Sequence, residues 1–468
     1  MTSPERPFGL ADALDASDES QDTGLRHVRG LSAQPGEGAA AAEQRTAGPE
    51  RVVLVGAWTS GTLAEAESSM AELAALAEAA GGLVLDGVIQ RRDKPDPATF
   101  IGSGKAQELR ELVEEWAADT VVCDGELSPA QLVRLEEVVK AKIVDRTALI
   151  LDIFAQRATS KEGKAQVELA QLQYMLPRLR GWGQSLSRQM GGGGGAGGGM
   201  ATRGPGETKI ETDRRRLREK ISKLRRELDE MKTGRDVKRM ERRRNKVPSV
   251  ALAGYTNAGK SSLLNRLTGA DVYVRNALFA TLDPTVRRGQ TSGGRTYTLA
   301  DTVGFVRHLP HQLVDAFRST LEEVAEADLI LHVVDGTHPD PEAQIEAVRA
   351  VIGEIGGAGV QEIVVVNKAD AAPPEVLSRL LEAEPGAVAV SARTGQGCDA
   401  LLARVEEALP QPDVEVEVLI PYTQGHLVSR VHEEGEILTE DHDENGTRLR
   451  ANVDARLAAE LAAYTTLS

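Results

Sequence analysis

The 468-residue chain has few cysteines, few aromatic residues and no long apolar run. Its two cysteines, Cys123 and Cys398, show no metal-ligand spacing, so a cysteine metal centre is not expected and a reducing cytosolic setting is the default. Aromatic residues are only 3% of the chain, whereas hydrophobic residues reach 41%, which predicts aliphatic cores. No run of about 18 apolar residues occurs, and the start lacks a basic region followed by an apolar core. We therefore expect a soluble, cytoplasmic protein with no membrane span and no secretion signal.

Positive charge is scarce overall but is concentrated in one segment. The net charge of −16 argues against general nucleic-acid binding. Residues 207–246, however, hold 17 Lys/Arg against 9 Asp/Glu, a local charge of +8 in a chain whose remainder is −24. A basic helix on an acidic protein favours a phosphate-rich partner held at one place. A solvated helix face with alternating charges is the alternative.

Apolar runs alternate with helical patterns, and the length allows about three domains. Residues 1–50 lack periodicity and are expected to be a disordered extension. Residues 51–155 predict an N-terminal α/β domain with a parallel sheet. Its expected strands are 52–55, 83–89, 120–123 and 143–145, and its expected helices are 62–80, 106–117 and 129–139. Residues 411–468 predict a small C-terminal α/β domain with a hairpin turn at 444–447.

Residues 156–246 are expected to form a helical hairpin with a glycine-rich tip. A helical pattern runs to about Leu179, where Pro177 must kink the helix or begin its end. Two apolar stripes are expected to pack together, namely Leu169, Leu172, Leu176 and Leu179 against Ile210, Leu217, Ile221, Leu224, Leu228 and Met231. Eight glycines and one alanine at 191–199 form the tip. The basic residues around it are Arg188, Arg203, Lys209 and Arg214. A functional loop and a flexible linker are the two interpretations of this tip.

Residues 254–262 combine a phosphate-binding motif with a strand before it and a helix after it. The motif G-x-x-x-x-G-K-S follows the apolar run 250–253 and precedes a helical pattern at 263–267. Bound phosphates would meet successive backbone N–H groups and the positive end of the helix. Lys260 would reach the terminal phosphates, and the Ser261 hydroxyl would bind Mg²⁺. The expected nucleotide-binding residues are Gly254, Tyr255, Thr256, Asn257, Ala258, Gly259, Lys260, Ser261 and Ser262.

Two later segments predict which base is selected. The first, after an apolar strand, comprises Asn367, Lys368, Ala369 and Asp370. A carboxylate at Asp370 can accept hydrogen bonds from N1–H and the exocyclic amine of guanine, whereas adenine offers neither donor. GTP is therefore the expected substrate. The second segment, also after an apolar strand, comprises Ser391, Ala392 and Arg393 and is expected to close over the base.

Two further segments are expected to respond to the γ-phosphate. They comprise Phe279, Ala280, Thr281, Leu282 and Asp283, and then Asp301, Thr302, Val303 and Gly304. Asp301 would face the metal, and the Gly304 N–H would meet the γ-phosphate. Thr281 is the candidate second hydroxyl ligand of Mg²⁺, with Thr285 as its rival. We therefore expect Lys260, Thr281 and Gly304 to serve catalysis, and Ser261 and Thr281 to bind Mg²⁺. Segments of this kind are released when the γ-phosphate is lost.

Two positions bear on how the attacking water is placed. Phe305 follows Gly304, where small signalling GTPases carry a water-orienting Gln, so slow intrinsic hydrolysis is expected. Asn257 matches an Asn that in some related GTPases holds K⁺, and K⁺ is accordingly a second candidate cation. Bracing of the loop is the alternative role of Asn257. Arg307 and His308 are expected to make surface or partner contacts, with a catalytic role as the alternative.

The predicted fold class is α/β, with a P-loop G domain at 247–410, the N-terminal α/β domain, the helical hairpin and the small C-terminal α/β domain. The chain resembles the HflX family of bacterial translational GTPases over about 51–468. Besides 254–262 and 279–285, the resemblance rests on T-F-I-G-S-G-K at 99–105, Q-V-E-L-A-Q-L at 166–172 and R-G-P-G-E-T at 203–208. The last three lie outside any generic G domain. The long glycine run and Pro177 depart from the family pattern.

This resemblance implies a cytoplasmic GTPase that associates with the 50S ribosomal subunit and its rRNA and splits or rescues stalled or idle ribosomes. The loop of about 181–206 would reach toward the peptidyl-transferase region, and the basic helix would lie on rRNA. A monomer is expected. One alternative is a GTPase assembly factor of the large subunit. Another is an ATP-dependent RNA remodeller, because residues 100–105 look like half a phosphate loop before a helix. A helix N-terminal loop that touches RNA or phosphate is the preferred interpretation of 100–105.

Overall fold

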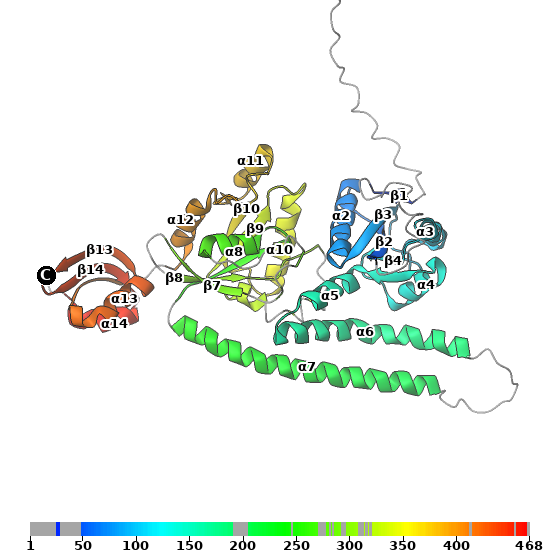
Figure 1. Ribbon diagram of the computed structural model, residues 1–468, viewed down its shortest axis with the longest axis horizontal. Helices are drawn as coiled ribbons and strands as arrows, with labels where there is room; N and C mark the ends of the chain where they lie inside the picture. Colours follow the sequence, from blue (N-terminus) through cyan, green and yellow to red (C-terminus); the bar gives the residue numbers. More distant parts are fainter. Residues whose placement is uncertain are drawn as a thin grey trace, which may run out of the picture. The chain divides into compact units, whose positions relative to one another are not determined.

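The computed structural model forms two compact units, residues 1–149 and 150–468 (Figure 1). It describes residues 25–28, 48–190, 205–244, 247–269, 278–279, 282, 285–291, 296–307, 313, 317, 321–410, 414–453 and 455–465. Predictions for the glycine run 191–199 and for Arg203 fall outside these residues.

The first unit is built on a five-stranded sheet in the order β1-β3-β2-β4-β5. Its strands are β1 (Arg26–His27), β2 (Glu50–Trp58), β3 (Gly82–Arg91), β4 (Thr120–Asp124) and β5 (Lys142–Asp145). Strands β2 to β5 are parallel, as predicted, whereas β1 pairs antiparallel with β3. The prediction that all of 1–50 is disordered is therefore wrong at 25–28. Burial of Val28 and an ion pair of His27 with buried Asp86 at 2.7 Å hold this short strand, and a two-residue strand carries no periodicity.

Three helices cover this sheet close to the predicted ranges. They are α2 (Leu63–Ala79), α3 (Ser103–Glu115) and α4 (Pro129–Val139). The Thr62 hydroxyl accepts from the Glu65 N–H at the start of α2, and Ser128 and Gln131 form a capping box at α4. Such caps satisfy backbone donors that a helix leaves unbonded at its first turn. Cap residues in the sequence therefore determine where α2 and α4 begin.

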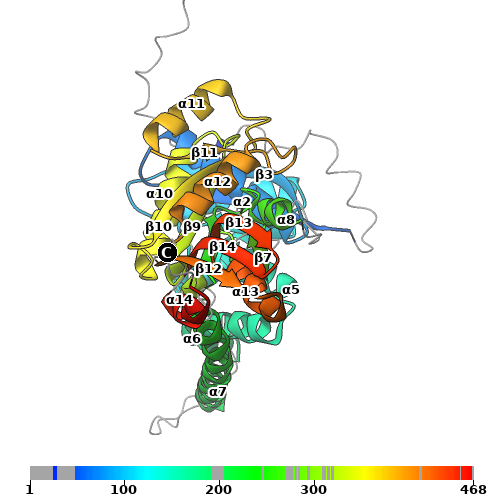
Figure 2. The same ribbon diagram turned by 90° about the vertical axis from the view of Figure 1, so that its left-hand side faces the viewer.

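The predicted hairpin is confirmed, and its helices are longer than expected. After α5 (Arg146–Arg157), α6 (Lys161–Met190) and α7 (Pro205–Arg244) lie side by side (Figures 1 and 2). The predicted stripes meet in one cluster of Ala165, Leu169, Leu172, Ile221 and Leu224, flanked by Leu176, Leu217, Leu228 and Met231.

Pro177 does not end the first helix, which continues to Met190. The expected loop at 181–206 is thus wrong at 181–190 and at 205–206, where the chain is helical. A proline inside a helix removes one hydrogen bond and costs about 3 kcal/mol. Packing of Leu172 and Leu176 against α7 offsets that loss on the turns around Pro177. The Arg178 guanidinium also donates to the Tyr174 carbonyl at 3.0 Å.

The G domain has a six-stranded sheet in the order β11-β10-β9-β6-β8-β7. Its strands are β6 (Ser249–Gly254), β7 (Thr285–Gln290), β8 (Thr296–Asp301), β9 (Leu329–Asp335), β10 (Gln361–Asn367) and β11 (Val388–Ala389). The helices are α8 (Lys260–Thr268), α10 (Pro341–Glu354), α11 (Pro374–Ala383) and α12 (Cys398–Ala408). Along β6, Val250 and Leu252 join the core under α8 and α12, while Ala251 and Ala253 join the core under α10. This strand is apolar throughout because both of its faces are buried.

The C-terminal domain has a three-stranded antiparallel sheet in the order β12-β14-β13. Its elements are β12 (Val414–Ile420), η1 (Tyr422–Gln424), α13 (Gly425–Glu434), β13 (Glu436–Asp443), β14 (Gly446–Val453), α14 (Ala455–Leu461) and η2 (Ala462–Tyr464). The predicted hairpin turn is confirmed between β13 and β14. Helices α13 and α14 cover one face of the sheet through a single aliphatic cluster.

Candidate functional site

The predicted nucleotide-binding segments meet at one edge of the G-domain sheet. Strands β6, β8, β9 and β10 are mutually parallel neighbours, so their carboxyl ends lie together. These ends carry Gly254, Asp301, Asp335 and Asn367. Ligands of open α/β sheets bind outside the carboxyl ends of the strands. The topology therefore brings together motifs that are more than 100 residues apart in the chain.

The phosphate loop turns through backbone conformations that favour glycine. Gly254 and Gly259 have φ of 146° and 95°. A Cβ at Gly254 would lie 2.2 Å from the Val333 carbonyl oxygen, and one at Gly259 would lie 2.2 Å from the Asn367 side-chain nitrogen. Asn257 also has a positive φ, 60°, which asparagine tolerates better than most residues. Glycine is thus required at both ends of the loop for close approach as well as for conformation.

Lys260 begins α8 and is buried under the loop. Its Nζ donates to the carbonyl oxygens of Gly254 and Tyr255 at 3.0 and 2.9 Å. Burial lowers the pKa of Lys260 to about 8, and the nearby Asp301 carboxylate opposes this shift. The ammonium group is therefore held among backbone oxygens, in a place where added negative charge would stabilise it.

Ser261 and Asp301 bring two oxygen donors together beside Lys260. The Ser261 hydroxyl donates to Asp301 Oδ2 at 2.6 Å. The next residue after Asp301, Thr302, is buried and donates from its hydroxyl to the Leu252 carbonyl at 2.6 Å, which fixes the end of β8. Among the described residues, no group of three or more His, Cys, Asp or Glu side chains is placed to hold a metal ion.

Gly304 lies tightly against the phosphate loop. A Cβ at this position would approach Thr256 Cγ2 to 2.8 Å and Lys260 Nζ to 3.1 Å. The neighbouring Phe305 exchanges backbone hydrogen bonds with this loop, accepting from Thr256 N at 2.7 Å and donating to the Gly254 carbonyl at 3.1 Å. The Phe305 ring is buried in the core under α10, so it is not available to orient a water molecule.

Asp370 is held by two partners from the segment predicted to close over the base. The Ser391 hydroxyl donates to Asp370 Oδ1 at 2.6 Å, and the Arg393 guanidinium pairs with Oδ2. The Ser391 hydrogen bond, aided by Arg393, lowers the pKa of Asp370. The carboxylate is therefore ionised at neutral pH and oriented by residues about 20 positions away. Asn367 joins the same two segments, since its Oδ1 accepts from the Ala392 N–H at 3.0 Å.

Sequence reasoning missed Asp335, which lies at the end of β9. Its Oδ2 pairs with Lys368 Nζ at 2.5 Å, and its Oδ1 accepts from the Thr337 N–H and hydroxyl at 3.0 and 2.6 Å. Asp335 thereby fixes the lysine expected to cover the base. The signal available in the sequence was an acidic residue at the end of an apolar strand. That strand, β9, pairs with β10, which ends at Asn367.

Some predicted site residues are not among those described. Ala280, Thr281 and Asp283 lie outside the described residues, whereas Phe279 and Leu282 are described and buried. The rival metal ligand Thr285 opens β7, opposite Asp301 in the register of β8. The roles of Thr281 and Thr285 therefore stay predictions. Tyr255, Thr256, Ala258, Ser262, Val303 and Ala369 occupy the predicted loops and helix start.

The short motif at 100–105 opens α3 in the first unit. Lys105 Nζ pairs with Glu108 at 2.5 Å on the same helix. The Arg92 guanidinium donates to the Ile101 carbonyl at 3.0 Å. A Cβ on Gly102 would lie 2.5 Å from Arg92 Nη1. The positive groups here are thus engaged with protein oxygens.

Four family models match successive parts of the chain. They are "GTP-binding GTPase N-terminal" at 67–155, "GTP-binding GTPase Middle Region" at 157–242, "50S ribosome-binding GTPase" at 249–368 and "HflX C-terminal domain" at 376–464. The GTPase HflX of Lacrimispora saccharolytica is 45% identical over 413 residues, which are 88% of this chain and 96% of that protein. The GTPase HflX of Escherichia coli is 43% identical over 80% of this chain and 87% of its own length.

The chain belongs to the HflX family of GTPases. A crystal structure of a GTP-binding protein from Sulfolobus solfataricus in complex with GDP is 25% identical, covers 77% of this chain and 98% of its own, and has a TM-score of 0.39. Within the described part of this HflX family member, no helix combines the length and the apolar character needed to cross a membrane.

Proposed function

We propose that this HflX family GTPase hydrolyses GTP on the 50S ribosomal subunit in the cytoplasm, and that its helical hairpin contacts rRNA to split or rescue stalled or idle ribosomes. The observation that carries the proposal is a bond between the hairpin and the nucleotide-binding domain. Lys232 on α7 donates to Glu322 at 2.8 Å, in a helical segment that follows Gly304. Through this ion pair, a movement of the segment that follows Gly304 would be transmitted to α7 of the hairpin.

Selection of GTP is supported by the geometry around Asp370. Its two carboxylate oxygens are oriented by Ser391 and Arg393, and guanine offers two donors to such a pair of acceptors. Lys368, which pairs with Asp335, would cover the base. ATP lacks both donors, so the same site would leave the carboxylate unsatisfied.

The residues present also fit Mg²⁺. Ser261 Oγ and Asp301 Oδ2 are hard oxygen donors within 2.6 Å of each other, and Mg²⁺ prefers few protein ligands completed by phosphate oxygens and waters. Mg²⁺ would neutralise charge on the β- and γ-phosphate oxygens. Lys260 would contribute a fixed positive charge, and the Gly304 N–H would hold the γ-phosphate. Asn257, on the outside of the loop, is the proposed K⁺ ligand.

Binding to rRNA is supported by the exposed charge of α7. The described part of this helix exposes seven basic side chains, namely Arg215, Arg216, Arg218, Lys220, Lys223, Arg225 and Arg226. The opposite face is closed by the apolar contact with α6. Phosphate contacts by Lys and Arg supply most of the non-specific affinity for nucleic acid and make it salt-dependent.

GTP turnover with and without purified 50S subunits tests the central claim. We expect slow turnover alone, stimulation by 50S subunits, and little turnover of ATP. The same assay in K⁺ and in Na⁺ tests Asn257, because turnover that is indifferent to the cation would remove its proposed role. A preference for ATP at this site, or indifference to 50S subunits with either nucleotide, would overturn the proposal.

Sucrose-gradient analysis of 70S ribosomes separates splitting from the assembly alternative. Splitting predicts GTP-dependent loss of the 70S peak and binding to mature 50S particles. Retention only on immature particles would favour an assembly factor. If Gly104 and Lys105 substitutions removed ATP turnover while GTP turnover persisted, the ATP-dependent RNA remodeller would gain support.

The proposed contact between the hairpin and rRNA is tested by removing charge from the exposed face of α7. Replacing Arg218, Arg225 and Arg226 with Gln is expected to weaken 50S binding and to lower its salt dependence, because fewer counterions are released. The matched control replaces the same three residues with Lys and keeps the charge. Intrinsic GTP turnover should be equal in both variants. Equal 50S binding by the Gln and Lys variants would remove rRNA contact by this face.

A further inference from the structure

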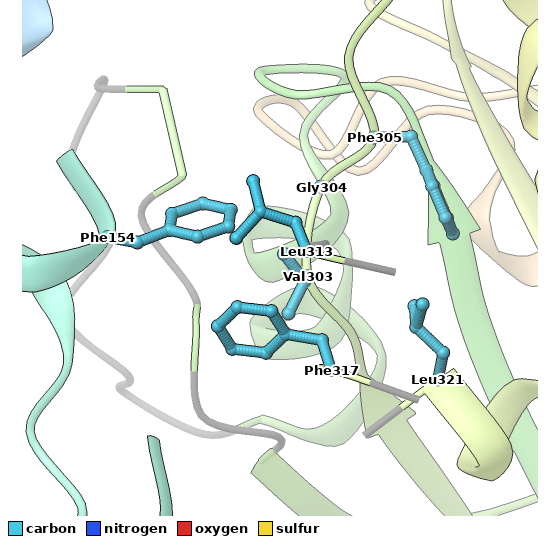
Figure 3. A pocket seen from close by; sticks show the side chains of 7 residues that line it. All are labelled: Phe154, Val303, Gly304, Phe305, Leu313, Phe317 and Leu321. Carbon is cyan, nitrogen blue, oxygen red and sulfur yellow. The ribbon is translucent and has the colours of Figure 1, made fainter. Parts of the chain in front are cut away.

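Phe154 on α5 packs against Phe279 and Phe317, two aromatic residues from different parts of the nucleotide-binding domain. Its ring is 1% exposed. The ring centroid lies 4.5 Å from that of Phe279 and 5.2 Å from that of Phe317, with interplanar angles of 85° and 75°. Both are edge-to-face arrangements, which aromatic pairs favour. Figure 3 shows the Phe154 ring reaching from α5 toward Val303, Leu313 and Phe317.

Phe279 belongs to the first of the two segments predicted to sense the γ-phosphate, whereas Phe317 lies 13 residues after Gly304, the last residue of the second segment. Phe279 lies two residues before Thr281 in the sequence. Its φ of 54° is unusual for a bulky residue, and such a conformation persists only when surrounding packing maintains it. Phe317 follows Gly304 in the chain and is helical. A single ring from outside the nucleotide-binding domain therefore contacts the first segment at Phe279, and it lines one cavity together with Val303 and Gly304 of the second segment.

A purely structural role as a core residue explains burial but not the composition of this cluster. The chain has six phenylalanines; Phe154 packs against two of the others, Phe279 and Phe317, and lines one cavity with a third, Phe305. The other cores are mainly aliphatic. A small apolar cavity lies between Phe154 and the residues on either side of Gly304, Val303 and Phe305. Movement of either segment would change the packing of this ring directly, because packed interiors do not deform continuously.

We propose that Phe154 is a positioning residue for GTP hydrolysis. By packing against Phe279 and by lining one cavity with Val303 and Gly304, its ring holds both segments in the arrangement that GTP hydrolysis requires. Helix α5 thereby sets the hydrolytic conformation of a site to which it contributes no ligand. This inference rests on the proposed GTP hydrolysis and adds a residue outside the nucleotide-binding loops.

The test replaces Phe154 with Leu in the full chain. F154L keeps an apolar side chain of similar size but loses both ring contacts. We expect intrinsic kcat for GTP to fall about 10-fold or more, and the Mg²⁺ concentration for half-maximal turnover to rise. Affinity for GDP should stay within about twofold, because GDP lacks the γ-phosphate to which the two segments are predicted to respond.

The control is Leu149→Ala, which removes a buried side chain five residues before Phe154 on the same helix. A general loss of α5 packing would lower kcat in both variants, and that outcome would overturn the positioning role. Unchanged kcat in F154L beside an active parent would also overturn it. If the parent itself failed to turn over GTP in the presence of 50S subunits, the proposed function would fail instead.

A second variant, Phe154→Met, tests whether any flexible apolar group suffices. Full kcat in F154M would likewise reject a role for the ring.

Discussion

The side-chain amide of Asn367 donates to the carbonyl oxygen of Ala258 at 2.7 Å, across 109 residues of sequence. Ala258 lies in the phosphate loop, and Asn367 ends the strand that precedes Asp370. The other end of the same amide accepts from Ala392 N–H. One buried side chain therefore joins the phosphate loop to both segments predicted to contact the base.

Replacing Asn367 with Ala should weaken the binding of GDP and GTP alike. The change leaves the Ala258 carbonyl and the Ala392 N–H without this partner, and each unsatisfied buried group costs about 1–3 kcal/mol. We expect affinity to fall by about 10- to 100-fold, measured with fluorescent nucleotides. Asn452→Ala, which removes an amide bonded to Glu436 in the C-terminal domain, is the matched control and should bind both nucleotides normally.

Replacing Asp370 with Asn should change the base that is preferred. The amide presents one donor where guanine requires an acceptor, so GTP affinity should fall on the order of 100-fold or more. Xanthine carries an oxygen in place of the exocyclic amine and should bind the variant better than the parent. Competition of GTP, XTP and ATP for a fluorescent nucleotide measures both effects. Retained preference for GTP would show that Asp370 does not select the base.

Replacing Gly304 with Ala should impair hydrolysis more than GDP binding. The added Cβ would meet Thr256 and Lys260, so the segment must shift away from the γ-phosphate position. We expect at least a 10-fold fall in kcat and a small change in GDP affinity. Gly353→Ala is the control, because a Cβ there meets nothing within 4 Å and lies in helix α10. That control should keep full kcat and gain up to about 1 kcal/mol of stability from helix propensity.

Nucleotide affinity should fall as the pH rises above about 8. The pKa of Lys260 in the folded protein is lowered to about 8 by burial, from 10.5. Phosphate binding favours the charged ammonium, so the complex binds a proton that the nucleotide-free protein has lost, and affinity decreases with pH in this range. The effect on folding has the opposite sign. Between about pH 8 and pH 10.5 the Lys260 side chain binds more protons in the unfolded chain than in the folded one, so its contribution to the free energy of unfolding of the nucleotide-free protein rises with pH.

Titration of GDP affinity between pH 6.5 and pH 9.5 measures the first effect. Lys260→Arg keeps a positive charge throughout and should show a flat profile at lower affinity, since arginine does not deprotonate in this range. A parent profile equally flat across pH 8 would contradict the expected change in Lys260 ionisation.

The sequence determined the elements that depend on neighbours along the chain. The glycines at 254 and 259 and the lysine and serine after them act within one loop and one helix turn, so their spacing was sufficient to predict their place. Cap residues such as Ser128 fixed helix starts for the same reason. The stripes of α6 and α7 were visible as spacings of three, four and seven residues, which place side chains on one helix face.

Only the tertiary structure decided which distant groups meet. Asp335 reaches Lys368 because the neighbouring parallel strands β9 and β10 end at one edge of the sheet. Phe154 reaches Phe279 and Phe317 because long-range packing brings α5 against the nucleotide-binding domain. Packing also overrode two local expectations, since α6 continues past Leu179 to Met190 and residues 26–27 pair with β3. Local preferences are worth a few kcal/mol at most, and burial of apolar surface in a long-range contact can exceed them.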